Sequence, residues 1–324
     1  MKSRYLVLLF SFVLISCGQD SFMGSPKSKK IDISDGIPIE IFIGLTSSAT
    51  REKGDIVSEE TSMTMEFNNA VFFLFDKIES KGIITWNKKK ITEYSERNSD
   101  ETNYTEKIIK DQEITKGMTG KQPFEEKEIS DIEGETFLYK KFKNKWEIKL
   151  LNENPTPKQN EILRDKNISM NSWYSCIEQN NLNKKIKLGE KLMINQRELC
   201  LFGVDKFGKF NDLSLTFTDT SSVDGISYAH FLLLGEAEMT MDKLGENVKT
   251  GSIQSERKSK ELSIKANFIG KITFCMDNNL IEKFEVDMNG KGKGTTVAMD
   301  MELPIEFEAS IKGTIKSELL NRKK

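Results

Sequence analysis

The sequence predicts a mainly β protein of the α+β class. Two long-stranded antiparallel β-meanders are expected to form a curved sheet, a sandwich or a half-barrel, with about three short helices between them. Apolar and polar residues alternate with a period of two over long stretches, a pattern that a strand keeps on separate faces and a helix would scramble. Helix-start signals occur only between the two alternating halves. The chain has 324 residues, of which 37% are hydrophobic, enough to bury a sizeable core.

The alternation is clearest in the C-terminal third, over Leu262–Met276 and Val297–Ile315. A strand as long as the second would span about 60 Å, so we expect such strands to bend or break. Pro304, Gly313, Gly270 and Gly235 are the natural places. Further strands are expected at Asp212–Asp219, Ile226–Met241 and Leu280–Met288, with turns at Asp277-Asn278-Asn279 and Lys291-Gly292-Lys293-Gly294.

The N-terminal half repeats the alternation less regularly. The polar stretch from 98 to 120 reads either as solvent-facing strands or as a long loop. Six strands are expected here: Ile39–Leu45, Ser62–Phe75, Lys81–Trp86, Phe124–Ile132, Thr136–Phe142 and Trp146–Leu150.

Helices are expected only in the middle of the chain. Thr156 is a cap with Pro157 at the first helical position, for a helix that runs to about Lys166. A second short helix is expected at Ser169–Gln179, and a third opens with the capping box Asn195-Gln196-Arg197-Glu198 and closes at Gly203. The body therefore divides into a meander over 37–151, a helical middle over 152–203, a second meander over 204–318 and a basic tail over 319–324.

Residues 1–16 have the pattern of a signal peptide. Lys2 and Arg4 precede the apolar stretch Tyr5–Ile15, which is too short to cross a bilayer as a helix. The residues Leu14-Ile15-Ser16-Cys17 resemble the bacterial lipobox. The resemblance implies cleavage between Ser16 and Cys17, a diacylglyceryl group on the Cys17 thiol and acylation of its new amine. An ordinary secretory peptide with an incidental cysteine is the alternative.

Residues 17–36 are polar and rich in small residues, so they read as an acylated flexible tether. Gly18 stands where an inner-membrane retention signal of the familiar type would have Asp, which by analogy favours the outer membrane, facing the periplasm or the cell surface. The order of segments in the body also resembles uncharacterised β-rich envelope lipoproteins, through Lys185-Ile186-Lys187-Leu188-Gly189-Glu190, Phe274-Cys275-Met276-Asp277 and Leu280-Ile281. This resemblance implies fold and location, and no activity.

The sequence contains no recognisable pattern of catalytic, cofactor-binding or metal-binding residues, and we assign no residue to these roles. The only histidine, His230, has no recognisable catalytic motif around it, so a hydrogen-bonded structural role is favoured over a catalytic one. Gly290–Gly294 is read as a hairpin turn in preference to a phosphate loop. The carboxylates Asp300, Glu302, Glu306 and Glu308 are read as a solvated face in preference to a Ca²⁺ site, and Lys88-Lys89-Lys90 and Lys140-Lys141 as surface charge.

Three cysteines remain beside Cys17. Cys176 and Cys200 both lie in the helical middle, so they form the favoured disulfide, which would contribute about 3 kcal/mol. Cys275 sits on the polar side of its strand and is left over. The alternative is that all three are reduced and largely buried thiols.

The functional prediction is a membrane-anchored envelope lipoprotein that is not an enzyme. It would bind or scaffold, with a possible apolar ligand cleft lined by Met and Phe side chains. A purely structural or surface-exposed lipoprotein with a closed core is the alternative, and an envelope hydrolase is a weaker one. The expected partners are the membrane, through the acyl chains, and a lipid or another envelope protein. Nucleic acid is excluded because a formal net charge of -2 gives no long-range attraction to phosphate.

Overall fold

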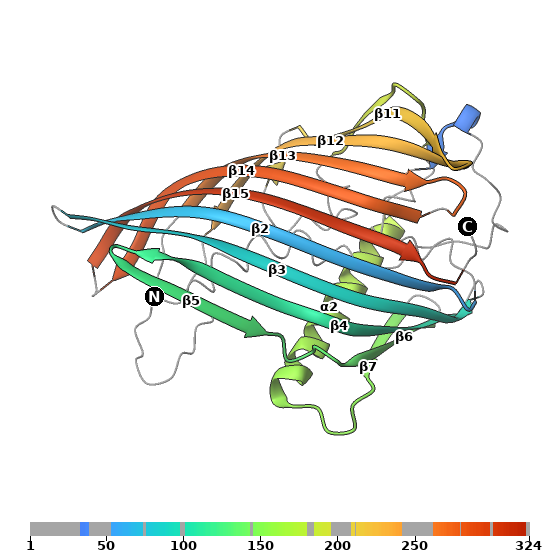
Figure 1. Ribbon diagram of the computed structural model, residues 1–324, viewed down its shortest axis with the longest axis horizontal. Helices are drawn as coiled ribbons and strands as arrows, with labels where there is room; N and C mark the ends of the chain where they lie inside the picture. Colours follow the sequence, from blue (N-terminus) through green and yellow to red (C-terminus); the bar gives the residue numbers. More distant parts are fainter. Residues whose placement is uncertain are drawn as a thin grey trace.

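A computed structural model shows one extended antiparallel sheet, against which one α-helix lies among the residues that the structure describes (Figure 1). The structure describes residues 33–38, 53–73, 76–97, 101–142, 145–179, 185–195, 209–210, 212–241, 262–278, 280–298 and 301–321. The strands of the sheet are β2 (Ile56–Phe73), β3 (Asp76–Arg97), β4 (Glu101–Thr119), β5 (Gln122–Ile129), β6 (Thr136–Phe142), β7 (Lys145–Leu150), β9 (Lys191–Met193), β10 (Lys209–Phe210), β11 (Ser214–Val223), β12 (Ile226–Met241), β13 (Leu262–Cys275), β14 (Leu280–Ala298) and β15 (Met301–Leu319).

The two meanders are joined edge to edge. The strand order is β7-β6-β4-β3-β2-β15-β14-β13-β12-β11-β9, with β5 beside β4 and β10 beside β12. β2 and β15 pair antiparallel from Ile305 opposite Val71 to Leu319 opposite Val57, so the first long strand of the sheet joins the last. The sheet curves strongly and is not closed, because β7 and β9 lie at opposite ends of this order. The mainly β, antiparallel prediction is confirmed, and one continuous curved sheet is formed.

Alternating burial separates an inner from an outer face, as the sequence pattern predicts. On β15 the inward residues Phe307, Ile311 and Ile315 are buried, while Glu308 and Lys312 between them are exposed. The buried side chains form two apolar clusters. The larger covers the inner face from β3 to β11 and takes in Ile37 of the short strand β1 (Ile37–Pro38), which pairs with β8 (Lys185–Ile186). The smaller lies where the helix meets β4, β6 and β7.

The helical middle differs from the prediction of three short helices. A single helix, α2 (Pro157–Gln179), replaces the first two, because no glycine or proline interrupts the chain between them. Thr156 caps it as expected: the Gln159 N–H donates to Thr156 Oγ1 at 3.2 Å and the Thr156 N–H donates to Gln159 Oε1 at 2.9 Å. Of the third expected helix, residues 196–203 lie outside the described residues, and Asn195 is not helical.

The predicted hairpin turn at Lys291–Gly294 is wrong, because β14 runs through it without a break. Glycine is needed there for close packing: a Cβ on Gly292 would lie 2.7 Å from Cγ1 of Ile264 on β13. Pro304 does not break β15 either. The ladder between β15 and β2 begins at Ile305, so the missing N–H of Pro304 costs no hydrogen bond to β2.

Most other predicted strands are present, several of them longer than expected. β6 and β12 have the predicted bounds, and residues 276–278 form a turn that overlaps the predicted Asp277-Asn278-Asn279. β4 occupies most of the stretch from 98 to 120, so of the two readings, strands or a long loop, the strand is confirmed. The predicted strand Ile39–Leu45 lies outside the described residues. In the portion of the chain that is described, no helix is long and apolar enough to cross a membrane.

Candidate functional site

A strip of charged side chains crosses the inner face between the two apolar clusters. The alternation that turns Ile84 inward on β3 also turns Lys88 and Lys90 inward, since all three have the same parity. The sheet register places Lys90 opposite Glu59 on β2 and Lys88 opposite Asp111 on β4. The prediction that Lys88–Lys90 are surface charge is therefore wrong for Lys90, which is buried, and the pattern beginning at Ile84 could have shown it.

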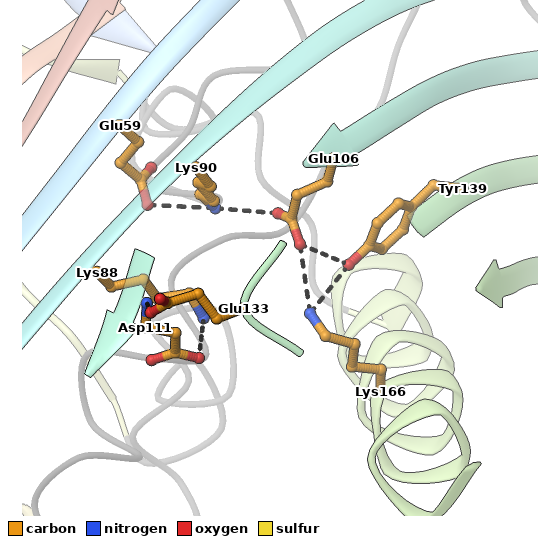
Figure 2. Close-up of polar contacts among 8 residues, drawn as sticks. All are labelled: Glu59, Lys88, Lys90, Glu106, Asp111, Glu133, Tyr139 and Lys166. Carbon is orange, nitrogen blue, oxygen red and sulfur yellow. Dashed lines mark hydrogen bonds and ion pairs between the residues drawn. The ribbon is translucent and has the colours of Figure 1, made fainter. Parts of the chain in front are cut away.

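At the centre of this strip two carboxylates and two ammonium groups alternate (Figure 2). Lys90 Nζ lies 3.2 Å from Glu59 Oε1 and 3.3 Å from Glu106 Oε2. Lys166, from α2, reaches the other oxygen of Glu106 at 3.3 Å. The Tyr139 hydroxyl lies 3.1 Å from Glu106 Oε1 and 3.2 Å from Lys166 Nζ. These five side chains, named here the inner ionic cluster, bring together β2, β3, β4, β6 and α2.

Burial makes these contacts stronger than surface ion pairs. The side chains of Lys90 and Glu106 are only 8% and 6% exposed. Burial alone would lower the pKa of Lys90, but the adjacent carboxylates of Glu59 and Glu106 outweigh it and hold that pKa above its usual range. Burial alone would raise the pKa of Glu106, but Lys166, Lys90 and Lys88 outweigh it and hold that pKa well below its usual range. Both groups therefore stay charged at neutral pH.

A second set of contacts continues the strip. Lys88 Nζ lies 3.9 Å from Asp111 Oδ2, and burial lowers the pKa of Lys88 because this distant carboxylate offsets it only in part. Glu133 accepts hydrogen bonds from the Asp111 backbone N–H at 2.8 Å and from Gln112 Nε2 at 3.1 Å. The backbone bond to Asp111 is the main reason that the pKa of Glu133 is lowered.

The inner ionic cluster suits a structural task better than a chemical one. Each ammonium group is engaged by a carboxylate, so neither could take up a further anion without losing a partner. Lys166 is the only member that α2 supplies, and it joins the helix to β4 through Glu106 and to β6 through Tyr139. Lys141 is also buried, so the expectation of surface charge fails there too.

His230 lies on the outer face of the sheet. Its Nε2 is 2.7 Å from Ser221 Oγ, and its Nδ1 is 3.5 Å from Thr273 Oγ1. The expected hydrogen bonding is confirmed. In serine hydrolases a carboxylate usually orients the imidazole, whereas here a hydroxyl faces Nδ1. The three residues line an open groove of about 700 Å³ together with Tyr228, Lys283, Lys316 and others.

The predicted solvated carboxylates are paired where the structure describes them. Glu306 lies 2.8 Å from Lys293, and Glu308 lies 2.7 Å from Lys291, on the outer face. Asp300 and the side chain of Glu302 lie outside the described part. Among the described residues no group of three or more His, Cys, Asp or Glu side chains could hold a metal ion.

The cysteines divide between described and undescribed residues. Cys275 is free and fully buried, in line with the alternative of reduced and largely buried thiols for this cysteine. The register shift between Thr273 and Phe274 has its extra residue, Glu282, on β14, whereas β13 pairs with β12 through Cys275 without a shift. Phe274, Cys275 and Met276 are all buried at this end of the strand. Burial raises the pKa of the Cys275 thiol. Ser16, Cys17, Cys200 and the side chain of Cys176 lie outside the described residues.

Comparison with known proteins places the chain in no family. No family model and no curated protein matches it. Among solved structures it is similar to the outer membrane protein OprG from Pseudomonas aeruginosa, with 5% identity, a TM-score of 0.25 and coverage of 83% of this chain and 98% of that chain. It is also similar to OccK7 from Pseudomonas aeruginosa, with 8% identity, a TM-score of 0.26 and coverage of 82% and 100%. OpdQ from Pseudomonas aeruginosa gives 8% identity, a TM-score of 0.25 and coverage of 80% and 99%.

Proposed function

We propose that this chain is a membrane-anchored lipoprotein of the bacterial envelope with a non-enzymatic scaffolding role. Acyl chains on Cys17 would hold it on the outer membrane, and the folded body would stand in water beside that membrane. The lipobox-like residues Leu14-Ile15-Ser16-Cys17 support the anchor. With two or three acyl chains, and about 0.8 kcal/mol from each buried CH₂, such an anchor is close to permanent.

The contrast between the two faces of the sheet supports a body surrounded by water. The outer face carries cross-strand ion pairs, among them Lys291 with Glu308 and Lys293 with Glu306. Such exposed pairs contribute little to stability, but they place charged groups on this face, beside exposed apolar side chains such as Leu234 and Ile269. An aqueous surrounding suits this face, and the anchor alone would then supply membrane attachment.

The burial of the inner face favours a closed core over an open ligand cleft. Met65, Phe274 and Phe307, which are among the residues expected to suit a greasy ligand surface, are at most 2% exposed. All three belong to the larger apolar cluster of the inner face. A scaffold with a filled interior is therefore the function that this geometry supports best.

Cell fractionation of a Cys17→Ser variant tests the anchor. The wild type is expected in the membrane fraction, and the variant is expected to lose at least ten-fold of its membrane association. A Ser21→Ala variant, changed in the same polar segment but not at the acylated position, should remain with the membrane. Equal membrane association of Cys17→Ser and wild type would refute the proposal.

Lipid analysis of the same Cys17→Ser protein tests the filled interior. Organic extraction of the purified protein followed by mass spectrometry should find no lipid in stoichiometric amount. One lipid per chain would favour the apolar ligand cleft over the closed core, and it would leave the anchor untouched.

A further inference from the structure

β7 ends the sheet on one side, and a strand at a sheet edge normally presents a row of unpaired N–H and C=O groups. Here the side-chain amides of two asparagines in α2 form hydrogen bonds with these backbone groups. Asn167 Oδ1 accepts from the Ile148 N–H at 2.9 Å, and Asn167 Nδ2 donates to the Ile148 carbonyl at 3.0 Å. Asn171 repeats both bonds with Trp146, each at 3.0 Å. The two amides together form the four hydrogen bonds that a further strand would make.

The spacing of these residues explains the fit. Asn167 and Asn171 are four residues apart on a helix and so share a face, about 6 Å from each other along the helix axis. Trp146 and Ile148 are two residues apart on a strand, about 6.6 Å from each other, and direct their backbone groups to the same side. We name this set of four hydrogen bonds the asparagine clamp.

Polar contacts account for much of the attachment of α2. Lys166, next to the clamp, bonds to Glu106 and Tyr139. Met170 is fully buried, and Ile162 and Leu163 pack against the smaller apolar cluster, whereas Ile168 is 61% exposed. The hold of α2 on the sheet is therefore part apolar and part polar, and losing the polar part makes the helix easier to displace from the β7 edge. The clamp is therefore well placed to decide whether the β7 edge is covered.

We infer that the asparagine clamp keeps this protein monomeric, and that an unclamped β7 edge pairs with the β7 of a second copy of the chain. The outward backbone groups of Trp146 and Ile148 fit an antiparallel pairing centred on Ile148. Ile148 then lies opposite its own copy, and Trp146 lies opposite Leu150. All of these are hydrogen-bonded positions of the ladder.

Charge favours the same register. Pairing centred on Ile148 sets Glu147 of each copy opposite Lys149 of the other. These are non-hydrogen-bonded positions, where the side chains of facing residues come closest. Both residues lie on the exposed side of β7 and already pair with each other within one chain at 3.0 Å. The strand is thus complementary to itself, with two Glu–Lys pairs across the two-fold axis.

The test uses the full mature chain in detergent micelles and measures its oligomeric state by native mass spectrometry and size exclusion. The wild type is expected to be a monomer, and Asn167→Ala combined with Asn171→Ala is expected to dimerise. Adding Lys149→Glu sets like charges opposite each other and should weaken that dimer at least several-fold. Glu147→Lys together with Lys149→Glu restores opposite charges across the axis and should recover it.

A second pair of substitutions guards against a variant that fails to fold. Asn167→Asp with Asn171→Asp keeps the size of both side chains and their acceptor oxygens but removes the donors to the two carbonyls. It should also dimerise, though more weakly. A wild type that dimerises as strongly as the variants would overturn the inference. The same holds if both double variants are monomeric, or if Lys149→Glu leaves their association unchanged.

Discussion

Glu106 is the residue whose loss should affect stability most clearly through charge. Glu106→Gln keeps the shape of the side chain but leaves Lys90 and Lys166 without the carboxylate they share, each 3.3 Å away. Removing one partner of a buried ion pair typically costs about 3–5 kcal/mol. Lys90 retains Glu59 at 3.2 Å, and the Lys166 side chain is 23% exposed, so the lower end applies. We expect a loss of about 3 kcal/mol in the free energy of unfolding.

Urea denaturation followed by circular dichroism measures this loss, and a matched surface variant supplies the control. Glu308→Gln breaks an ion pair whose Lys291 and Glu308 side chains are 79% and 56% exposed, so it should change the free energy of unfolding by less than about 0.5 kcal/mol. The assigned role of the inner ionic cluster would be wrong if Glu106→Gln were no more destabilising than this control.

Three further predictions concern the pH dependence of that variant, a glycine on β14 and the buried thiol. Because the folded pKa of Glu106 is lowered, its stabilisation is present above the unfolded pKa of about 4.3 and lost as pH falls towards the folded pKa. The difference in stability between wild type and Glu106→Gln should therefore be constant from about pH 8 to 5 and shrink below about pH 4; a constant difference down to about pH 2 would contradict this. Gly292→Ala should destabilise by about 1–3 kcal/mol in urea titrations, because its Cβ would lie 2.9 Å from the Ser263 carbonyl oxygen. Gly290→Ala, whose Cβ would meet nothing closer than 3.4 Å, should be nearly neutral, and equal losses would refute the packing argument. Cys275 should react with iodoacetamide at least a hundred-fold more slowly in the native protein than in urea, as followed by peptide mass spectrometry, since its thiol is fully buried; similar rates would show that this end of β13 is open.

Period-two alternation made the sheet predictable from the sequence. β12 and β6 were bounded correctly because regular alternation stops at their ends. Strand order could not be predicted in the same way, because pairing of β2 with β15 depends on contacts between residues more than 200 positions apart, which no local pattern encodes. The sequence also predicts the curvature, but the strand is not broken at Pro304 or Gly313, since a twisted sheet accommodates long strands without breaking them.

Two of the predictions that failed share a physical cause, because in both a residue type is given more weight than its position. Three glycines in five residues suggested a turn at 290–294, whereas Gly290 and Gly292 lie in a strand and leave room for Ala266 and Ile264 of β13. Three consecutive lysines suggest a solvent-exposed surface. However, Lys88 and Lys90 lie an even number of residues after the buried Ile84 and therefore share its inward face. The partners of Lys90 in the inner ionic cluster lie on β2 and β4, and α2 supplies Lys166. They can be identified only when the register of the strands and the position of the helix are known.

The burial of Cys275 could not be predicted from the alternation of its own strand. A regular pleat turns this side chain to the outer face, as predicted, and β13 pairs with β12 through Cys275 without a shift. The thiol is nevertheless fully buried, and the neighbouring segments that cover it are not encoded in the pattern of one strand. The asparagine clamp was missed for a related reason, because Asn167 and Asn171 read as ordinary polar helix residues until the edge of β7 is seen beside them.

The intact mass of the wild-type protein purified from membranes tests the central claim, a closed folded body held on a membrane by acyl chains at Cys17. The account predicts a chain that begins at Cys17 and carries two or three acyl chains. A mass that corresponds to an unmodified chain, or to one that begins at a residue other than Cys17, would contradict it.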